Sequence, residues 1–484
     1  MHTGNVGWSY KEVLPFFKKS ENNQDIDIVM DTKYHSVGGY LDVGRFPYQD
    51  NNVRTFTTAY KELGYEEVDF NADKVTGVMV IQATQRNGER KSTNRAFLEP
   101  VRHLRMNLKV VTNVRVTKVL IDPVTKQAHG VVYVHEKTRT STGTIFASRE
   151  IIVSGGTINS PQLLMLSGIG PKEVLQGLGI KVIQDLRVGE NLQDHVTVTG
   201  ITFQLSRSTS IVPKRDEIKA DVKKYTESKR TGPLSGTGVY QLEGYLKSRH
   251  IPAAEDYPDI QYFTHSKIVS EDPTECTTNI TRPLSYYNII KFAPTVVRPE
   301  SRGYITINST DPIVSPLIYP NYFSDPRDIE VIIDGLNIGV NLSKTDAMKS
   351  AGITLDTNRL DLCKYYEYGT DDYWICLARN YTQTLFHPAG TCKMGSSKDA
   401  GAVVDPQLRV HGVKRLRVAD ASVMPHVLSG NLNAGVIMIA EKCADFIKRD
   451  YLKSRAERRQ EDGKTSSQIS ASITREMQSI ESQL

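Results

Sequence analysis

The order of apolar and polar positions predicts helices and short strands along most of the chain. Apolar residues recur at helical spacing in four stretches, at 10–19, 54–63, 328–342 and 434–448. In the last stretch Val436, Ile439, Cys443 and Ile447 fall three or four positions apart, so this helix has one buried stripe. Short alternating or β-branched runs predict strands at 41–43, 302–307 and 415–418.

A denser group of strands is predicted between 108 and 153. Its runs of valine and isoleucine lie at 110–111, 114–121, 131–134, 145–146 and 151–153. The last run is followed by Gly155-Gly156 and then by an apolar helix. We expect this helix to begin with Ser160 as its N-cap and Pro161 as its first residue, and to end at Gly168.

The composition is that of a globular protein with little net charge. The chain has 484 residues, room for two or three domains, and 39% of them are hydrophobic. Lysine and arginine total 60 against 55 acidic residues, and no basic stripe alternates with aromatic residues, so we expect no nucleic-acid partner. No run of 18 apolar residues occurs, so we expect no transmembrane segment, and the first residues contain no secretory signal.

The five cysteines are too few for a disulfide scaffold. Cys363 and Cys376 are close enough in sequence to pair, but reduced, partly buried thiols are at least as good an interpretation. The sequence contains neither Cys-x-x-Cys nor His-Glu-x-x-His, so we expect no metal site.

In two segments a constrained turn carries groups that can contact a ligand or accept a proton. Gly155 and Gly156 allow a ligand to approach the backbone before a helix N-terminus, although many α/β turns share this pattern. His387 precedes Pro-Ala-Gly and therefore lies on a turn, where its imidazole can take a proton from a bound hydroxyl. A lone histidine is still more often structural than catalytic.

A third segment follows the predicted strand at 415–418. Asp420 lies at the carboxyl end of that strand, a usual place for a ligand contact in α/β folds. We expect Asn433 to cap the helix after it, and Asn431 is equally readable as a turn or cap residue. The positive end of the helix dipole favours negative charge nearby.

Taken together, these segments resemble the glucose–methanol–choline (GMC) oxidoreductase family. Residues 156–170 are similar to its second signature, and 189–195, 387–395 and 404–442 are similar to further family motifs. Residues 8–15 and 39–48 resemble the insect branch of glucose dehydrogenases that use FAD and a quinone. The likeness covers residues 4 to 450 in order.

The resemblance implies a mixed α/β fold. It implies a Rossmann-like FAD-binding domain, incomplete at its N-terminus, interwoven with a substrate domain built on an antiparallel sheet and helices. The implied divisions are an N-terminal segment with a lid-like stretch (1–70), parts of the FAD-binding domain (71–200 and 381–450), a substrate-binding domain (201–380) and a polar tail (451–484). Apolar residues between Ile469 and Leu484 allow a last amphipathic helix, but a solvated extension is the favoured interpretation.

The resemblance also implies roles for single residues. His387 matches the family histidine that accepts the alcohol proton, and Asn431 matches a second active-site position held by histidine or asparagine. The implied FAD contacts are Asp420 and Ala421 at the flavin, Asn433 and Ala434 at its pyrimidine, and the backbone of Val116 at the adenine.

Two departures from the family pattern stand out. Gly435 occupies a position where the family usually has proline, which leaves the helix start less rigid. The Gly-x-Gly-x-x-Gly fingerprint and the family's first signature do not occur in this sequence. We therefore expect the sequence to start after the main dinucleotide-binding unit and to retain FAD weakly or not at all.

The function implied is FAD-dependent oxidation of a CH–OH group of an alcohol or sugar, with a quinone or oxygen as electron acceptor. His387 would take the proton while the flavin receives the hydride. The alternative is a truncated or degenerate family member that binds a ligand or partner without FAD or catalysis. A hydrolase is excluded because no Gly-x-Ser-x-Gly elbow occurs. The chain leaves its compartment open, although the resemblance suggests secretion.

Overall fold

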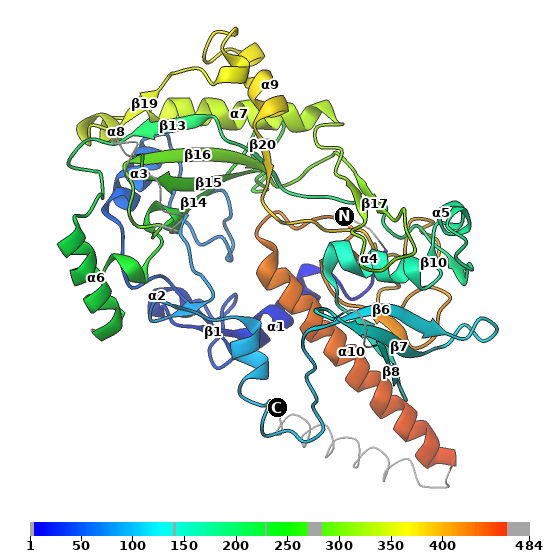
Figure 1. The fold of residues 1–484 in the computed structure, drawn as a ribbon. Helices are drawn as coiled ribbons and strands as arrows, with labels where there is room; N and C mark the ends of the chain where they lie inside the picture. Colours follow the sequence, from blue (N-terminus) through cyan, green and yellow to red (C-terminus); the bar gives the residue numbers. More distant parts are fainter. Residues whose placement is uncertain (1–3, 139–141, 228–229, 270–282, 462–484) are drawn as a thin grey trace.

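The computed structural model describes residues 4–138, 142–227, 230–269 and 283–461. Figure 1 shows an upper part built on a broad sheet beneath α7 (Pro326–Leu342) and α9 (Asp371–Asn380). The lower part contains α4 (Gly156–Leu166), a smaller sheet and the long helix α10 (Leu432–Glu461), whose N-terminal end lies nearest the broad sheet. None of the helices described combines the length and apolar content needed to cross a bilayer.

Eight strands of the described residues form the broad sheet, and all their pairings are antiparallel. The main path runs β19-β13-β16-β15-β14-β3, with β12 beside β16 and β20 beside β12. The strands are β3 (Gly77–Val80), β12 (Val196–Val198), β13 (Ile201–Gln204), β14 (Leu242–Leu246), β15 (Ile260–Lys267), β16 (Ile289–Val296), β19 (Thr354–Asp356) and β20 (Thr382–Thr384). The antiparallel sheet implied by the sequence is confirmed. The domain boundaries stay a prediction. The strands β3, β12 and β20 join this sheet from the ranges assigned to the FAD-binding domain.

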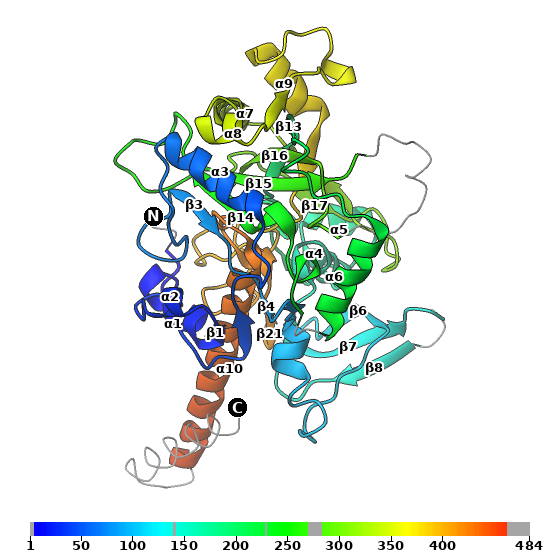
Figure 2. The ribbon, with the colours of Figure 1, turned by 90° about the vertical axis from the view of Figure 1, so that its left-hand side faces the viewer.

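The two faces of the broad sheet differ in chemistry because successive side chains of a strand point to opposite sides. One face carries large apolar residues that pack in one core with α3 (Asn51–Glu62), α7 and α9 (Figures 1 and 2). Its fully buried members include Phe56, Tyr60, Tyr262, Phe292 and Trp374. Burying each such side chain contributes about 1.5–3 kcal/mol, so this face fixes the sheet. The opposite face is free to carry polar groups.

The lower part has a second core around two short parallel strands, β9 (Ile151–Val153) and β21 (Leu416–Val418). A three-stranded antiparallel sheet of β6 (Val114–Ile121), β7 (Ala128–His135) and β8 (Thr142–Phe146) packs beside α4. These strands confirm four of the predicted runs. The strand predicted at 110–111 is wrong: this stretch pairs with no other strand of the described residues, and both its valines are exposed.

The start of α4 is corrected by a contact that the local sequence does not contain. The helix begins at Gly156, four residues before the predicted cap, because the carboxylate of Asp420 accepts a hydrogen bond from Gly156 N at 2.9 Å. Ser160 is inside the helix, and its hydroxyl donates to the same carboxylate at 2.6 Å. Pro161 has no N–H for the carbonyl of Thr157, and the hydroxyl of Thr391 donates to that carbonyl instead, at 2.6 Å.

The helix α10 starts at Leu432 and runs to Glu461, past the predicted end at Lys448. Asn433 is therefore in the first turn of the helix and not at its cap. The extension is packed against the lower part, because Leu452 is buried and Asp450 forms an ion pair with the buried Arg417 at 2.6 Å. The amphipathic helix considered for 469–484 lies outside the described residues.

The remaining elements connect or edge these two parts. The helices are α1 (Tyr10–Ser20), α2 (Ile26–Val29), η1 (Asn94–Leu98), α5 (Lys172–Gly177), α6 (Arg215–Glu227), η2 (Pro233–Ser235), η3 (Gly238–Gln241), α8 (Asp346–Ser350), η4 (Asp361–Cys363) and η5 (Ala421–Val423). The strands are β1 (Glu21–Asn23), β2 (Leu41–Val43), β4 (Gln85–Arg86), β5 (Glu89–Arg90), β10 (Ile169–Gly170), β11 (Gln184–Asp185), β17 (Tyr304–Thr306) and β18 (Leu317–Tyr319). The predictions of α1, α3, α7, β2, β17 and β21 are confirmed within a few residues.

A buried histidine clamps the N-terminal segment. His35 Nδ1 lies 2.9 Å from Glu21 Oε1 and its Nε2 lies 2.8 Å from Asp69 Oδ2. Burial alone lowers the pKa of His35, but the hydrogen bonds and charges of Asp69 and Glu21 outweigh it and raise this pKa to about 9. The imidazolium therefore ties β1 to the loop at 65–75.

We expect the His35 clamp to make stability depend on pH in the alkaline range. Because the folded pKa lies above the unfolded one, its stabilisation is complete below pH 6.5 and is lost as pH rises through about 9. The shift corresponds to roughly 3 kcal/mol. His35→Gln should lower the melting temperature at pH 6 and have little effect on it at pH 10. The control variant His103→Gln changes an exposed histidine and should leave the melting temperature unchanged at both pH values. Equal losses at pH 6 and pH 10 would contradict the clamp.

The structure pairs Cys363 with Cys376 in a disulfide, which resolves the alternative left open by the sequence. The bond joins η4 to α9 across 13 residues, and Cys392 and Cys443 are free and buried.

Loss of this disulfide should destabilise the upper part. A loop of this size is worth about 3 kcal/mol in the chain-entropy description. Cys363→Ser with Cys376→Ser should therefore lower the melting temperature, and a reducing agent should lower it in the wild type but not in the double variant. A reductant effect of the same size in both proteins would refute the pairing.

Candidate functional site

The site begins where two distant segments run side by side. Gln193 and Ala389 exchange backbone hydrogen bonds at 3.0 and 2.8 Å, and Leu385 N donates to His195 O at 3.0 Å. The adjoining strands β12 and β20 continue this antiparallel pairing. Gly390 has a φ of +95°, and a side chain there would collide with the backbone of Asn191, so glycine is required at this crossing.

The pairing brings two histidine rings together. His195 Nδ1 lies 3.0 Å from His387 Nδ1, and His195 Nε2 lies 2.9 Å from the carbonyl oxygen of Leu428. A carbonyl only accepts, so His195 Nε2 must carry a proton, and its neutral ring then accepts at Nδ1. His387 must donate from its own Nδ1. This leaves His387 Nε2 unprotonated, with no protein partner among the described residues.

Both rings are held in the neutral form. Burial is the main cause that lowers the pKa of His195 to about 3, and a charge on His387 would lower it further. Burial also lowers the pKa of His387, with partial opposition from the charge of Asp194. The free nitrogen of His387 is therefore a proton acceptor at neutral pH.

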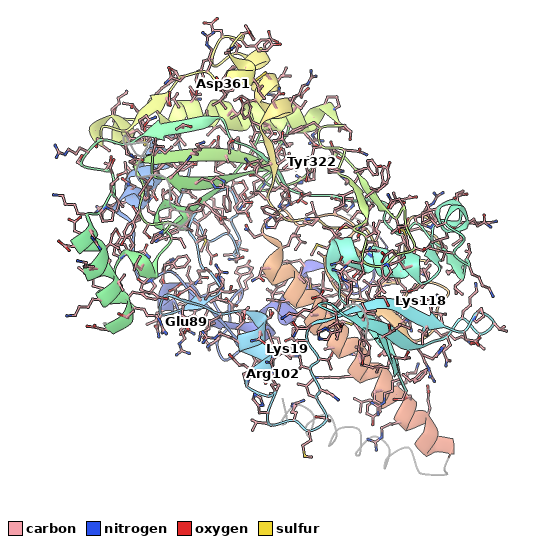
Figure 3. All side chains as sticks on the ribbon, viewed as in Figure 1. Lys19, Glu89, Arg102, Lys118, Tyr322 and Asp361 are labelled. Atoms are coloured by element: carbon pink, nitrogen blue, oxygen red, sulfur yellow. A yellow bond between two sulfur atoms is a disulfide. The ribbon has the colours of Figure 1, made fainter. Side chains whose placement is uncertain are left out.

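Asp194 fixes the backbone of His387. One carboxylate oxygen accepts from His387 N at 3.0 Å, and the other accepts from the hydroxyls of Tyr322 and Thr384, each at 2.5 Å. Figure 3 shows Tyr322 at the end of the broad sheet where the upper part meets the lower part. The residue before the histidine, Phe386, has a φ of +59° and an exposed ring, a strained conformation of the kind that is enriched at functional sites.

Asn431 immediately precedes α10 and is held from above by the broad sheet. Its Oδ1 accepts from Gln261 Nε2 at 2.9 Å, and the hydroxyl of Tyr245 lies 3.4 Å away. Its Nδ2 has no protein partner among the described residues and is a free donor. Leu428, the carbonyl partner of His195, lies only three residues before Asn431, so one short loop connects the two candidate side chains.

Asp420 and Ala421 form the third side of the site. The carboxylate of Asp420 is buried and is used within the protein, because it holds Gly156 and Ser160 and also accepts from Ser422 N at 2.8 Å. The carbonyl of Ala421 accepts from Gly390 N at 3.1 Å, which joins this turn to the His387 loop. Asp420 thus shapes the turn that carries Ala421, and the assigned flavin contacts of both residues stay a prediction.

Helix starts and glycines at this site fit a large anionic cofactor. Asn433 and Ala434 are exposed in the first turn of α10, where backbone N–H groups lack helical partners. Gly156 has a φ of +77° with no atom within 4 Å of the position a Cβ would occupy, so open space faces this turn. Together these features favour a negatively charged ring system beside α10.

The predicted site residues do not all meet. His387, Asn431, Asp420, Ala421, Asn433 and Ala434 belong to connected turns of the lower part. Val116 is apart from them on β6, next to an irregularity in the β6–β7 register, and is 40% exposed. Its assigned backbone contact to adenine stays a prediction.

Four side chains of the site were not assigned a role from the sequence: Asp194, His195, Glu243 and Gln261. The first two belong to the motif at 189–195, whose adjacent acid and histidine were a usable signal. The other two are polar residues in β14 and in the first, buried half of β15, where their neighbours along the strands are largely apolar. A buried polar side chain in such a strand needs a partner, and that requirement was the second signal.

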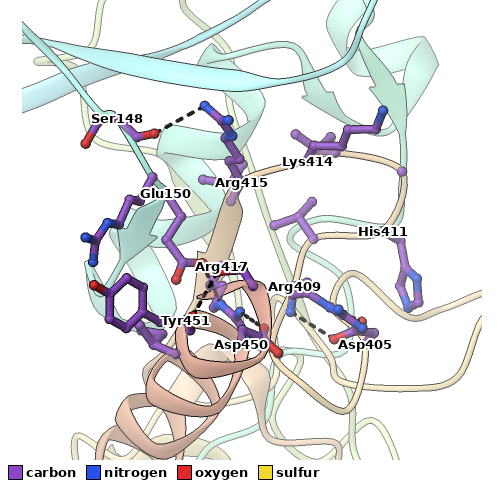
Figure 4. Close-up of a pocket in the computed structure, with 17 residues that line it drawn as sticks. Ser148, Glu150, Asp405, Arg409, His411, Lys414, Arg415, Arg417, Asp450 and Tyr451 are labelled. Atoms are coloured by element: carbon purple, nitrogen blue, oxygen red, sulfur yellow. Dashed lines mark hydrogen bonds and ion pairs between the residues drawn. The ribbon is translucent and has the colours of Figure 1, made fainter. Parts of the chain in front are cut away.

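A further hollow lies away from these residues. A basic hollow of about 710 Å³ is lined by the segments at 148–150 and 405–417 and by the C-terminal half of α10 (Figure 4). It is at the amino ends of β9 and β21, whereas ligands of parallel sheets bind at the carboxyl ends. Its Arg417 is already paired with Glu150 and Asp450. Within the described residues no group of three or more histidine, cysteine or acidic side chains is arranged to hold a metal ion.

Comparison with known proteins agrees with this geometry. Two family models described as GMC oxidoreductase match residues 1–197 and 299–440. The chain is 41% identical, over 93% of its length and 70% of the relative's, to glucose dehydrogenase [FAD, quinone] of Drosophila pseudoobscura pseudoobscura. It is 34% identical to alcohol dehydrogenase [acceptor] of Pseudomonas putida, over 92% of this chain and 76% of that one. In fold it is similar to an FAD-dependent oxidoreductase from Chaetomium thermophilum, with a TM-score of 0.78 and 24% identity over 93% of this chain and 82% of the other.

The hydrogen bond between the two rings predicts the tautomer of His387. Nitrogen NMR of the wild type should show His387 with its proton on Nδ1. In His195→Leu the acceptor is lost and both tautomers should be populated, whereas His195→Asn, which places an oxygen near the former Nδ1, should preserve most of the wild-type form. An unchanged tautomer in His195→Leu would show that His195 does not set it.

Proposed function

The chain belongs to the GMC oxidoreductase family, and on that premise we propose that it oxidises a hydroxyl-bearing carbon of a sugar, with His387 as the base. As a family member it is an FAD-dependent oxidoreductase that acts on CH–OH groups. The observation that carries the proposal is the neutral His387, whose Nε2 is left as a free acceptor by the contact of its Nδ1 with His195 at 3.0 Å.

In the proposed reaction His387 Nε2 takes the proton of the substrate hydroxyl. After the transfer the ring of His387 carries a proton on each nitrogen, since Nδ1–H already donates to His195. The Asp194 carboxylate supports the cation that forms, because it accepts from the backbone of the same residue at 3.0 Å. A positioned base of this kind contributes about 10²–10⁴-fold to a rate.

Asn431 orients the same oxygen. Its free Nδ2–H would donate to the hydroxyl oxygen and to the negative charge that develops there. The nearby first turn of α10 adds the positive end of a helix dipole. Orientation is important because a misplacement of about 1 Å can cost roughly 100-fold in rate.

FAD, when bound, would supply the acceptor for the hydride that leaves the carbon whose hydroxyl has lost its proton. In our proposal the first turn of α10 with Asn433 and Ala434 holds its ring end, and the turn at Asp420 and Ala421 holds the adjoining part. Val116 is proposed for the adenine. The open turn at Gly156 and the exposed helix start are the observations in favour.

For the substrate we favour a sugar over a sterol-like or other alcohol. The relative with 41% identity is named for glucose, and the face of the broad sheet toward the site carries hydrogen-bonding side chains, including Glu243, Tyr245 and Gln261. For the electron acceptor the same name favours a quinone over oxygen. The alternative of a binding protein without FAD or catalysis gains no support, because the family models and the relatives are all of oxidoreductases.

The test of the base is reduction of bound flavin by substrate, followed by absorbance in anaerobic stopped flow. His387→Ala should lower the reduction rate by about 10²–10⁴-fold at pH 7. His426→Ala, an exposed histidine on the neighbouring loop, is the matched control and should remain within twofold of the wild type. A rate for His387→Ala equal to that of the control would show that His387 is not the base.

The substrate class is tested in the same assay. Sugars and sterols are compared as reductants of the bound flavin of the wild type, and we expect sugars to reduce it faster.

A further inference from the structure

Two buried polar side chains of the broad sheet have no role in the reaction described so far. Glu243 lies on β14 and Gln261 lies on the neighbouring strand β15, and both are buried. They point away from the apolar core beneath α3 and α7, since their neighbours Leu242 and Tyr262 occupy that side. They therefore line the face that meets the start of α10.

One nitrogen atom connects these residues to the site. Gln261 Nε2 lies 2.8 Å from Glu243 Oε2 and 2.9 Å from Asn431 Oδ1. An amide nitrogen carries two hydrogens, so it can donate one to each oxygen. Gln261 Oε1 is buried and has no hydrogen-bond partner in the part of the chain that the structure describes, which leaves one acceptor unsatisfied. Rotating the amide of Gln261 by 180° would place its oxygen against Glu243 Oε2 and Asn431 Oδ1, and both of these acceptors would then lose their donor.

The charge of Glu243 fixes the direction of both hydrogen bonds. An ionised carboxylate only accepts, so the atom of Gln261 that faces it must be the nitrogen, and the atom of Asn431 that faces this nitrogen must be oxygen. The Nδ2–H of Asn431 then points away from the sheet as a free donor. A protonated Glu243 can donate, and it permits the reversed arrangement, in which Gln261 presents its oxygen and Asn431 turns its own oxygen outward.

The surroundings of Glu243 allow both states. Burial raises the pKa of Glu243 to about 7, opposed only by the hydrogen bond from Gln261. Tyr245 on β14 has a pKa raised by burial and by the charge of Glu243, and Tyr240 on η3, whose hydroxyl lies 3.2 Å from His265 Nδ1, has a pKa raised by burial, so both are neutral. His265 on β15 has a pKa lowered by burial and by Lys291 on β16, and Met79 of β3 pairs with Glu243. Among the described residues no cation forms an ion pair with this carboxyl.

We infer that Gln261 is a positioning residue for Asn431, and that Glu243 acts through it to decide which end of the Asn431 amide faces the substrate oxygen. The inference rests on the proposed function. With Glu243 ionised, Asn431 offers a donor to an oxygen that is losing its proton. With Glu243 protonated, the reversed amide offers a second acceptor, which repels that oxygen. Turnover should therefore rise with pH as Glu243 ionises, and burial lowers the pKa of His387, so this base is already neutral at pH 7.

The kinetic test uses the flavin-loaded protein and its pH profile. Wild-type kcat should rise about tenfold across pH 6–8 with KM nearly constant, since the interaction acts on the reacting oxygen. Glu243→Gln has no ionisation and, like protonated Glu243, can donate as well as accept, so it should lose the step and keep kcat near the low-pH value at every pH. Glu67→Gln, an exposed control, should keep the step. Gln261→Met should lower kcat about tenfold with KM within twofold.

Double variants with Asn431→Ala distinguish a positioning role of Glu243 and Gln261 from a merely structural one. In an Asn431→Ala background, neither Glu243→Gln nor Gln261→Met should change kcat further, because both act only through the lost amide. Melting temperatures of all variants identify any that fail to fold. A persistent pH step in Glu243→Gln, or an undiminished effect of Gln261→Met in the Asn431→Ala background, would overturn the inference.

A second readout needs no turnover. Infrared spectra of the flavin-free protein should show the carbonyl band of a protonated, buried carboxyl that disappears as pH rises through about 7, and this band should be absent from Glu243→Gln. Absence of the band from the wild type would overturn the inference. If the wild type titrates in this way but no sugar reduces its flavin, the proposed function fails while the link from Glu243 to Asn431 stands.

Discussion

The site depends on one hydrogen bond between two neutral imidazole rings. Two such rings can bond only if one donates and the other accepts, and the carbonyl of Leu428 settles which ring does which. Burial keeps both rings neutral, and the antiparallel pairing of Gln193 with Ala389 keeps them within reach. Without that bond, the tautomer of His387 would not be fixed. With it, a single nitrogen is left able to accept a proton.

The same principle operates on the other side of the site. The amide oxygen of Asn431 is bonded to a buried partner, as Nδ1 of His387 is. The proposed function of each side chain depends on the nitrogen that is left without a partner among the described residues. In each case the partner comes from the other part of the molecule: His195 leads into β12 of the broad sheet, and Gln261 belongs to β15. The apolar face of that sheet gives these partners their rigidity, because its core with α3 and α7 fixes the strands.

Much of this was predictable from the sequence, and the rest was not for identifiable reasons. Periodicity located α7, β9 and β21, and the family motifs located His387, Asn431 and the turn at Asp420. The start of α4 was misplaced because Asp420, which satisfies Gly156 N, is far away in the chain. The end of α10 was misplaced because Arg417 and Leu452 anchor a stretch that is polar by composition. The role of His195 could not be read locally, because its partner is 192 residues away.

The carboxylate of Asp420 bears on how the protein can be assembled. It holds the first turn of α4 across a sequence separation of 264, and it also accepts a hydrogen bond within its own turn, from Ser422 N. A ribosome therefore releases the α4 segment long before the group that completes that turn has been made. Contacts of such long range slow folding, and the growing chain carries an open glycine turn until Asp420 has been made. The two turns that this carboxylate joins are therefore completed late, and until then the α4 segment is open to chaperones and proteases.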